Sequence, residues 1–306
     1  MTAATTVPGR SLRRVRPQRL MLHAFLIVIS IVWLVPLLYA FYTALRPVSD
    51  TIRHGYVSLP ASLSFDNFIS VWDLAQIPYY YLNTLIVVVP AVFLALFLAS
   101  LVAFAVSRFS FRLNVALLMM FTAGNLLPPQ VIIVPLYWLY LAIPVPSLVH
   151  LPFIGLFPSD NGLLYDQYVG IILIHVVFQT GFCTFVLSNY MRTISSELVE
   201  AALVDGAGVW TIYRRVILPL TTPAMAALAT LEFTWIYNDF FWALLLMKSG
   251  AKRPITSALN NLQGAFFTNY NLLAAGALLA AIPTIIVFIA LQRQFVRGLT
   301  LGSTKG

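Results

Sequence analysis

Two carboxylates stand inside a long apolar stretch of the chain and are the side chains best placed to do chemistry. Glu232 and Asp239 lie seven residues apart within the stretch 222–247, and that separation puts them roughly on one face of a helix. A carboxylate inside a bilayer is costly, and it usually carries a function or is paired. The pair predicts a polar path or a proton relay. The alternative is a structural hydrogen bond, which is more plausible for Asp239 near the outer end of the stretch.

The other polar residues in apolar stretches are weaker candidates. Gln130 and Asn238 are possible contacts along the same path, although amides in spanning helices more often hold helices together. Because Cys183 is the only cysteine, neither an intrachain disulfide nor a cysteine metal cluster is expected. His175 is interpreted as a packing residue, since no second histidine is placed to form a haem-binding pair with it. The sequence therefore predicts no metal site and no catalytic residue.

These polar residues are rare in a chain that is mostly apolar. Of its 306 residues, 60% are hydrophobic and only 9% are charged, whereas soluble domains carry about 25% charged residues. Such a chain cannot cover a water-facing surface, which excludes a soluble enzyme and a disordered chain. The apolar stretches are long and do not alternate with period two. They predict an all-α, polytopic membrane helical bundle rather than a barrel.

Six apolar runs are each long enough to cross a bilayer, which takes about 20 residues. A seventh, 145–157, is too short and is expected at the surface or as a re-entrant segment. The third run contains Pro128, Pro129 and Pro135, which predict either a kinked packing helix or a broken helix that lines a path. The expected spans are 21–45, 81–106, 113–141, 168–190, 222–247 and 271–291.

The basic residues set the expected orientation. The net charge is +8, and with the N-terminus inside, thirteen Lys and Arg fall in inner segments and five in outer ones. Both ends are therefore expected in the cytoplasm, as a basic tail over 1–20 and a second tail over 292–306, flanking one transmembrane domain over 21–291. The first run is longer than the apolar part of a signal peptide, so a retained helix is expected.

One inner segment, 191–221, has a pattern of its own. Ser195 or Ser196 can cap a first helix, Gly206 can end that helix in a left-handed conformation, and Leu218-Pro219 then lead into the fifth span. The pattern predicts helix, glycine turn and helix at the inner membrane face. It suits either an amphipathic hairpin lying on lipid or a docking element for a cytoplasmic partner.

The same residues resemble the EAA loop of permeases from ATP-binding-cassette importers. The family pattern is Glu-Ala-Ala, three residues, Gly, nine residues, Ile, any residue, Leu-Pro, and this chain departs from it only by Val216 in place of Ile. Four features at fixed spacing in an inner loop make a specific signal. By this resemblance, the residues that couple the permease to an ATPase are Glu200, Ala201, Ala202, Asp205, Gly206, Leu218 and Pro219.

Three further segments resemble the maltose-type, MalG-like carbohydrate permeases. They are Phe-Asp-Asn-Phe at 65–68, the stretch 235–240 with Tyr237 in place of a tryptophan, and the ending 298–306 with Thr304 in place of a valine. The resemblance runs from about residue 20 to the end of the sequence. It implies the MetI-like fold of type I importer permeases, with six transmembrane helices, in a prokaryotic cytoplasmic membrane.

The resemblance also implies partners. A second, MalF-like permease, two cytoplasmic ATPase subunits and an extracytoplasmic solute-binding protein would complete the importer, and the chain would contact membrane lipid but no nucleic acid. The loop 248–270 would face the binding protein, and Glu200 would pair with a basic group of the ATPase. None of the three lysines follows a Gly-x-x-x-x-Gly sequence, so the P-loop is missing. We therefore expect a permease and not an enzyme, without cofactors of its own, and ATP and Mg²⁺ on the partner ATPase.

A second function stays open at this point. An ion- or proton-coupled secondary transporter could use Glu232 or Asp239 as the carrier group and would need no ATPase. It would leave the pattern of 191–221 unexplained. The sequence favours an ATP-driven importer for an oligosaccharide, a sugar or a polyol, in which the EAA loop couples ATPase movements to alternating access.

Overall fold

The described part of the chain folds into helices and the loops between them. The computed structural model describes residues 17–110, 112–126, 128–145, 162–262 and 268–300. The all-α expectation is confirmed, because the only β pairing found within these ranges is an isolated bridge between Pro144 and Leu163. The elements are α1 (Pro17–Leu45), α2 (Val48–His54), α3 (Asp66–Leu74), α4 (Ile77–Arg108), α5 (Asn114–Leu126), α6 (Pro129–Ala142), α7 (Tyr168–Arg192), α8 (Ser196–Val204), α9 (Val209–Ile212), η2 (Tyr213–Ile217), α10 (Leu218–Tyr237), α11 (Phe241–Leu246), η3 (Gly250–Lys252), α12 (Ile255–Ala258), η4 (Leu259–Leu262) and α13 (Tyr270–Thr300).

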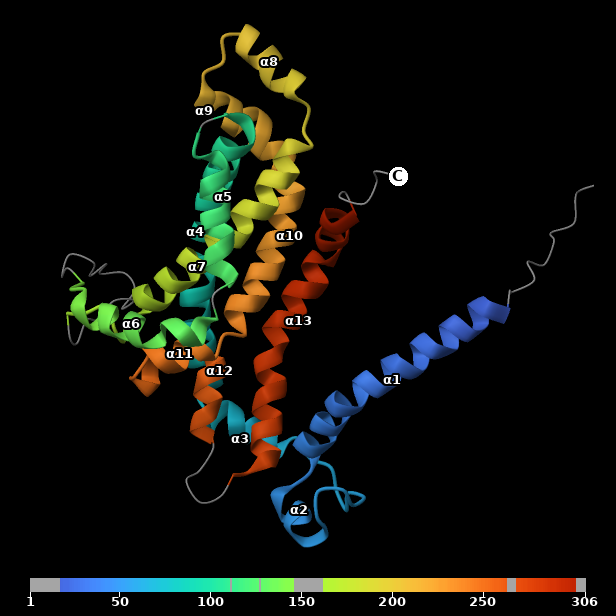
Figure 1. Cartoon of the computed structure of the whole chain (residues 1–306). Helices are drawn as coiled ribbons and strands as arrows, with labels where there is room; N and C mark the ends of the chain where they lie inside the picture. The colour runs from blue at the N-terminus through green and yellow to red at the C-terminus, as the bar shows by residue number, and fades with distance from the viewer. Residues whose placement is uncertain (1–16, 111, 127, 146–161, 263–267, 301–306) are drawn as a thin grey trace, which may run out of the picture.

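Five of the described helical stretches are long and apolar enough to cross a membrane. They contain α1, α4, α7, α10 and α13 (Figure 1) and correspond to the first, second, fourth, fifth and sixth expected spans. The fifth has different ends from those expected, because it starts at Val209 and stops at Tyr237. After Asn238 and Asp239 the chain enters the short helix α11.

The expected third span, 113–141, is not one continuous helix. α5 ends at Leu126, α6 begins at Pro129, and Pro128 between them is extended, with φ −60° and ψ 127°. The 13 residues of α5 reach only about 20 Å, short of the roughly 30 Å hydrocarbon core. α6 runs across the bundle instead of along it (Figure 1). Of the two alternatives for these prolines, the structure has the broken helix and not the kinked one, because each proline removes a donor and disfavours helix before it.

The described bundle is centred on the contact between α4 and α7, its most extensive helix pairing. One face of α4 carries Ala91, Ala95, Ala99 and Ala103, spaced four apart and fully buried. α7 likewise buries Gly181, Cys183, Thr184 and Ser188. Small side chains let two helix backbones approach closely, which matters in lipid because burial of apolar surface gives little gain there.

The start of α7 is held to α6 by another close approach. The buried hydroxyl of Tyr140 on α6 donates to the carbonyl of Gly170 at 2.9 Å. A Cβ at Gly170 would lie 2.6 Å from the carbonyl oxygen of Leu164 and 3.0 Å from the Tyr140 ring. The lack of a side chain at Gly170 therefore permits this packing, which sets the position of α6 beside the bundle.

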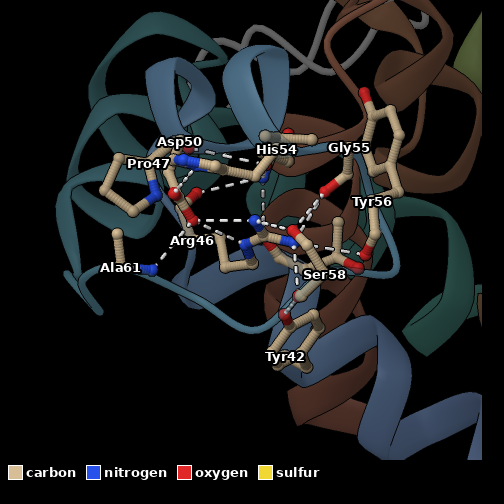
Figure 2. A network of polar contacts seen from close by, with 12 residues as sticks. Tyr42, Arg46, Pro47, Asp50, His54, Gly55, Tyr56, Ser58 and Ala61 are labelled. Atoms are coloured by element: carbon tan, nitrogen blue, oxygen red, sulfur yellow. Dashed lines mark hydrogen bonds and ion pairs between the residues drawn. The ribbon is translucent and has the colours of Figure 1, made fainter.

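A buried arginine fastens the loop that follows α1. Arg46 is 1% exposed, and its Nε donates to Asp50 Oδ2 at 2.9 Å (Figure 2). Its Nη1 donates to the carbonyls of Gly55 and Tyr56 at 3.0 and 3.2 Å, and its Nη2 donates to Ser58 Oγ at 2.9 Å. One guanidinium thus organises the turn after α2 by satisfying several acceptors at once.

Two buried asparagines tie this loop to distant helices. Asn67 on α3 donates to the carbonyls of Ala44 and Arg46 at 2.8 and 2.7 Å. Asn271 on α13 donates to the carbonyls of Thr43 and Arg46, both at 3.0 Å. The end of α1, α3 and the start of α13 are therefore joined at one end of the molecule. We call Arg46, Asp50, Asn67 and Asn271 the outer cluster, because the distribution of basic residues predicts that this end faces outward.

Gly170→Ala should destabilise the protein. The new methyl would meet a backbone carbonyl at 2.6 Å, and overpacking of this kind costs about 1–3 kcal/mol. We expect a lower thermal midpoint in mild detergent. Gly124→Ala on α5 is the control, because a Cβ there meets nothing within 4 Å and alanine favours helix. Equal midpoints for the two variants would contradict the close approach.

Acid should loosen the outer cluster. The hydrogen bond from Arg46, supported by His54 and the Ala61 amide, outweighs desolvation and lowers the pKa of the Asp50 carboxyl below its ordinary 3.8. A carboxyl with a lowered folded-state pKa stabilises the fold above its unfolded pKa, and this stabilisation is lost as the pH falls through the folded pKa.

The thermal midpoint should therefore fall as the pH drops below about 4. Asp50→Asn should be less stable than the wild type at neutral pH and should show a weaker dependence on acid. Asp73→Asn, at an exposed position on α3, is the control and should keep the wild-type profile. An Asp50→Asn profile parallel to that of the wild type would argue against this role.

Candidate coupling segment and polar groups of the bundle

The segment 191–221 begins with a capped helix. Ser195 lies just before α8 with φ −54° and ψ 136°, and its Oγ accepts a hydrogen bond from the Glu197 amide at 3.2 Å. Of the two serines that the sequence offers as caps, Ser195 is the one used. Glu197 lies in the first turn, where a negative charge is favoured by the helix dipole.

The first helix ends in a Schellman motif. The amide of Gly206 donates to the carbonyl of Leu203 at 3.0 Å, and the amide of Ala207 donates to the carbonyl of Ala202 at 2.9 Å. Gly206 has φ +77°, and a Cβ there would meet nothing within 4 Å. The left-handed backbone, rather than crowding, is therefore what requires glycine. The predicted glycine turn is confirmed.

Beyond this turn the chain forms one continuous helical rod. α9, η2 and α10 run together from Val209 to Tyr237, and Leu218 and Pro219 open α10. A proline ring inside a helix collides with the carbonyl four residues earlier, and the π-helical turn η2 directly before it is wider than an α-helix. The rod therefore passes Pro219 without ending, and it links the inner segment mechanically to the core of the bundle.

The rod is fixed to α4 by its first turns. Ile212, Tyr213 and Ile217 are buried. The Tyr213 hydroxyl is hydrogen-bonded to the Ser100 hydroxyl at 2.7 Å, and its ring packs on Phe104 with 5.3 Å between centroids. Movement of α9 is therefore coupled to α4 as well as to α10.

α8, in contrast, is barely attached. None of its residues is buried, and it lies beyond α9 at one end of the molecule (Figure 1). Leu198, Leu203 and Val204 expose apolar side chains, and on α8 it is Val199 and Ala202 that pack partly on the bundle. Four of the coupling residues expected from the sequence are exposed on α8 and in the turn that follows it. They are Glu200, Ala201, Asp205 and Gly206.

Glu232 lies inside the bundle and not in an open path. It is fully buried on α10, and its Oε1 accepts a hydrogen bond from the Cys183 thiol of α7 at 3.2 Å. Its Oε2 has no hydrogen-bond partner. In this conformation Glu232 joins α7 to α10, which corresponds to the alternative of a structural hydrogen bond.

The other candidates for a polar path serve local needs. Asp239 accepts hydrogen bonds from the amides of Trp242 and Ala243 at 3.3 and 3.1 Å, so it caps α11, with His175 Nε2 3.7 Å away. Asn238 is exposed and donates to a carbonyl of its own helix. Gln130 is exposed on α6. The structure thus does not gather Gln130, Glu232, Asn238 and Asp239 into one site.

Sequence reasoning missed the residues that hold the outer loop after α11. Asp166 has φ +62°, and its carboxylate accepts from the amide of Ser249 at 2.9 Å and from the Ser249 hydroxyl. Lys252 Nζ donates to the Asp166 carbonyl at 3.2 Å. Asn83 on α4 donates to the carbonyls of Ala251 and Arg253 at 2.7 and 3.1 Å. The lone Asp166 before an apolar run was the only local signal.

The membrane bundle thus carries an exposed helix, α8, that is joined to its core by a continuous helix. This arrangement suits a transporter subunit that is moved by a partner. Residues 91–301 match the family described as "Binding-protein-dependent transport system inner membrane component", and the chain belongs to this family. It is a permease subunit of an ABC importer and not itself an enzyme. The alternative of a secondary transporter loses its support.

Relatives and solved structures agree with this assignment. The probable ABC transporter permease protein YurM of Bacillus subtilis (strain 168) is 31% identical over 282 residues, 92% of this chain and 86% of that protein. The melibiose/raffinose/stachyose import permease protein MelC of the same strain is 30% identical over 248 residues, 81% and 83% of the two chains. A crystal structure of a bacterial ABC transporter for alginate import matches with TM-score 0.72 at 22% identity, over 95% of this chain and 100% of that chain. This match supports the MetI-like fold.

Removal of the Asp166 carboxylate should free the outer loop. Lys252 is buried while Lys248 is exposed, so trypsin should cut after Lys248 before it cuts after Lys252. In Asp166→Ala, cleavage after Lys252 should rise about tenfold, as expected when about 1.5 kcal/mol of local stability is lost.

Asp73→Ala, which removes an exposed carboxylate elsewhere, should leave both cleavage rates unchanged. An unchanged rate after Lys252 in the Asp166 variant would rule out this anchor.

Proposed function

We propose that this chain is the transmembrane permease of an ATP-driven importer for a carbohydrate, in the sense of an oligosaccharide, a sugar or a polyol. Support comes from the relatives, since MelC is named as an import permease for melibiose, raffinose and stachyose. The fold match to an alginate importer is compatible with a sugar but concerns the fold alone. The observation that carries the mechanism is the contrast between the exposed α8 and the continuous helix that follows it.

In this proposal α8 docks in a cleft of a cytoplasmic ATPase. Glu200 is exposed, and no ion pair with another described residue satisfies it, so its carboxylate is available for a basic group of the partner. Gly206 holds α8 at a fixed angle to α9. Closure of two ATPase subunits on ATP and Mg²⁺ would then move α9, and the rod would pass that movement to α4 and α10.

A second permease, MalF-like in character, would complete the membrane part. α1 is apolar, yet none of the residues in its most apolar window is buried, and it projects away from the bundle (Figure 1). Among the described residues, the main contacts of α1 lie near its C-terminal end, with α3, α13 and the outer cluster. A helix with an apolar surface all round needs a protein or lipid cover, and we assign this cover to the partner permease and to lipid.

The orientation follows from the positive charges. We propose that α8 and both termini face the cytoplasm, and that the outer cluster and the loop anchored by Asp166 face the extracytoplasmic solute-binding protein. Lys248, Gly250 and Ala251 are exposed on this loop, above a base fixed by Asn83 and Asp166. A rigid loop of this kind can press on a binding protein without losing its own shape.

The coupling role is tested by purification of the tagged chain from its native host with the subunits that accompany it. Glu200→Ala and Gly206→Ala should each lower recovery of the ATPase at least about fivefold and retain the second permease. The glycine variant acts because an L-residue in the left-handed conformation costs about 1–2 kcal/mol, so the free segment would relax to another turn.

Two neighbouring variants are matched controls. Glu197→Ala removes a charge from the same helix, and Gly208→Ala adds a methyl at a position with φ −68° and nothing within 4 Å. Both should recover the ATPase as the wild type does. If Gly206→Ala also does so, α8 is not the docking element.

The substrate class is tested on the binding protein that belongs to the same system. Neutral oligosaccharides, acidic oligosaccharides and polyols are compared by thermal shift, with amino acids as the reference class. Stabilisation by one of the sugars or polyols would support the proposal. Stabilisation by amino acids alone would overturn the carbohydrate assignment and leave the importer assignment in place.

A further inference from the structure

A cavity of about 340 Å³ opens on the bundle beside α4, where α9 and η2 pack. Its walls come from two stretches that are far apart in the sequence, namely α4 and the continuous helix that runs from α9 through η2 into the first half of α10. Figure 1 shows these elements meeting at the end of the molecule that carries α8. The wall includes Phe93, Phe97, Trp210, Arg214, Leu218 and Met225.

The cavity presents apolar surface and not sugar-binding groups. The Phe93 and Phe97 rings are stacked 6.2 Å apart and are both exposed. The hydroxyls of Ser100 and Tyr213, which also line the cavity, are hydrogen-bonded to each other at 2.7 Å. A sugar would find few partners here, whereas a hydrocarbon chain would lose no hydrogen bond on entry.

The mouth of the cavity is basic and amphipathic. Arg214 lines it, and both Arg214 and Arg215 are exposed. Trp210 is 58% exposed, and an indole at such a boundary is typical of the lipid headgroup level. On the proposed orientation this mouth faces the inner leaflet, whose anionic lipids attract arginine.

We propose that an anionic phospholipid of the inner leaflet occupies this site, with an acyl chain in the cavity and its phosphate against Arg214. A phosphate is the anion that matches the donors of a guanidinium. The lipid would touch η2, which links α9 to α10, and would thereby influence how movement of the inner segment reaches α10.

Photo-crosslinking of the purified importer tests this proposal. The probe is phosphatidylglycerol with a diazirine near the end of one acyl chain, and phosphatidylcholine with the same chain is the headgroup control. After irradiation in mild detergent, the phosphatidylglycerol probe should label peptides that cover 93–100 or 218–225, with several times the yield of the phosphatidylcholine probe.

Variants separate a specific site from bulk lipid. Arg214→Gln should lower the yield about fivefold, the loss of about 1 kcal/mol expected for one basic group near an anionic lipid, and Arg214→Lys should restore most of it. Met225→Trp, which fills the cavity and keeps the charge, should also lower the yield. Arg192→Gln, at an exposed arginine of α7, should change nothing.

Two results would overturn the proposal. One is equal labelling by the two probes with no effect of Arg214→Gln, which is the behaviour of bulk lipid. The other is no labelling of these peptides by either probe, which would leave the cavity to another occupant. Because detergent solution has no inner or outer leaflet, either result leaves the proposed orientation and function untouched.

Discussion

The position of every inner element depends on how closely α4 and α7 pack. In lipid the helices gain little from burying apolar side chains, so contact between backbones must supply the attraction. The buried alanines of α4, four residues apart, allow this contact. It places the inner ends of the two helices side by side, where Arg108 donates to the carbonyls of Met191 and Ile194 at 2.5 and 3.0 Å. The segment that follows α7 therefore leaves the bundle from a fixed point.

Along the segment 191–221, a helix with few contacts to the bundle is followed by a helix that is packed firmly against it. α8 buries none of its residues, whereas Ile212, Tyr213 and Ile217 in the following turns are buried against the bundle. Between them, the Schellman motif at Gly206 sets the angle through backbone hydrogen bonds within the segment. An element with few tertiary contacts can adapt to a partner, while a continuous helix transmits its displacement. The two properties needed for coupling thus lie on opposite sides of one glycine.

Features that depend on neighbouring residues could be predicted from the sequence. Ser195 and Gly206 act within a few residues of their own positions, so local rules for caps and turns located them. The break at Pro128 was one of two open alternatives, because a proline marks a disturbance without saying how far the helices diverge. The contacts of Asn271 with residues near Arg46 span more than 200 positions, and the Asp166–Ser249 contact spans 83. No periodicity encodes such pairs.

The buried carboxylates show why a polar residue in a membrane helix does not by itself locate a transport path. Asp239 is engaged where α10 ends, and its carboxylate supplies the acceptors that the first amides of α11 lack. Glu232 is fully buried and bonded to Cys183 across two helices. Asp239 could act as a carrier only if the contacts it makes were broken first, and Glu232 only if the bundle opened around its buried carboxylate. The energy for such a rearrangement has to reach the bundle from outside. The helix from Val209 to Tyr237 connects the segment 191–221 to Glu232 and ends two residues before Asp239.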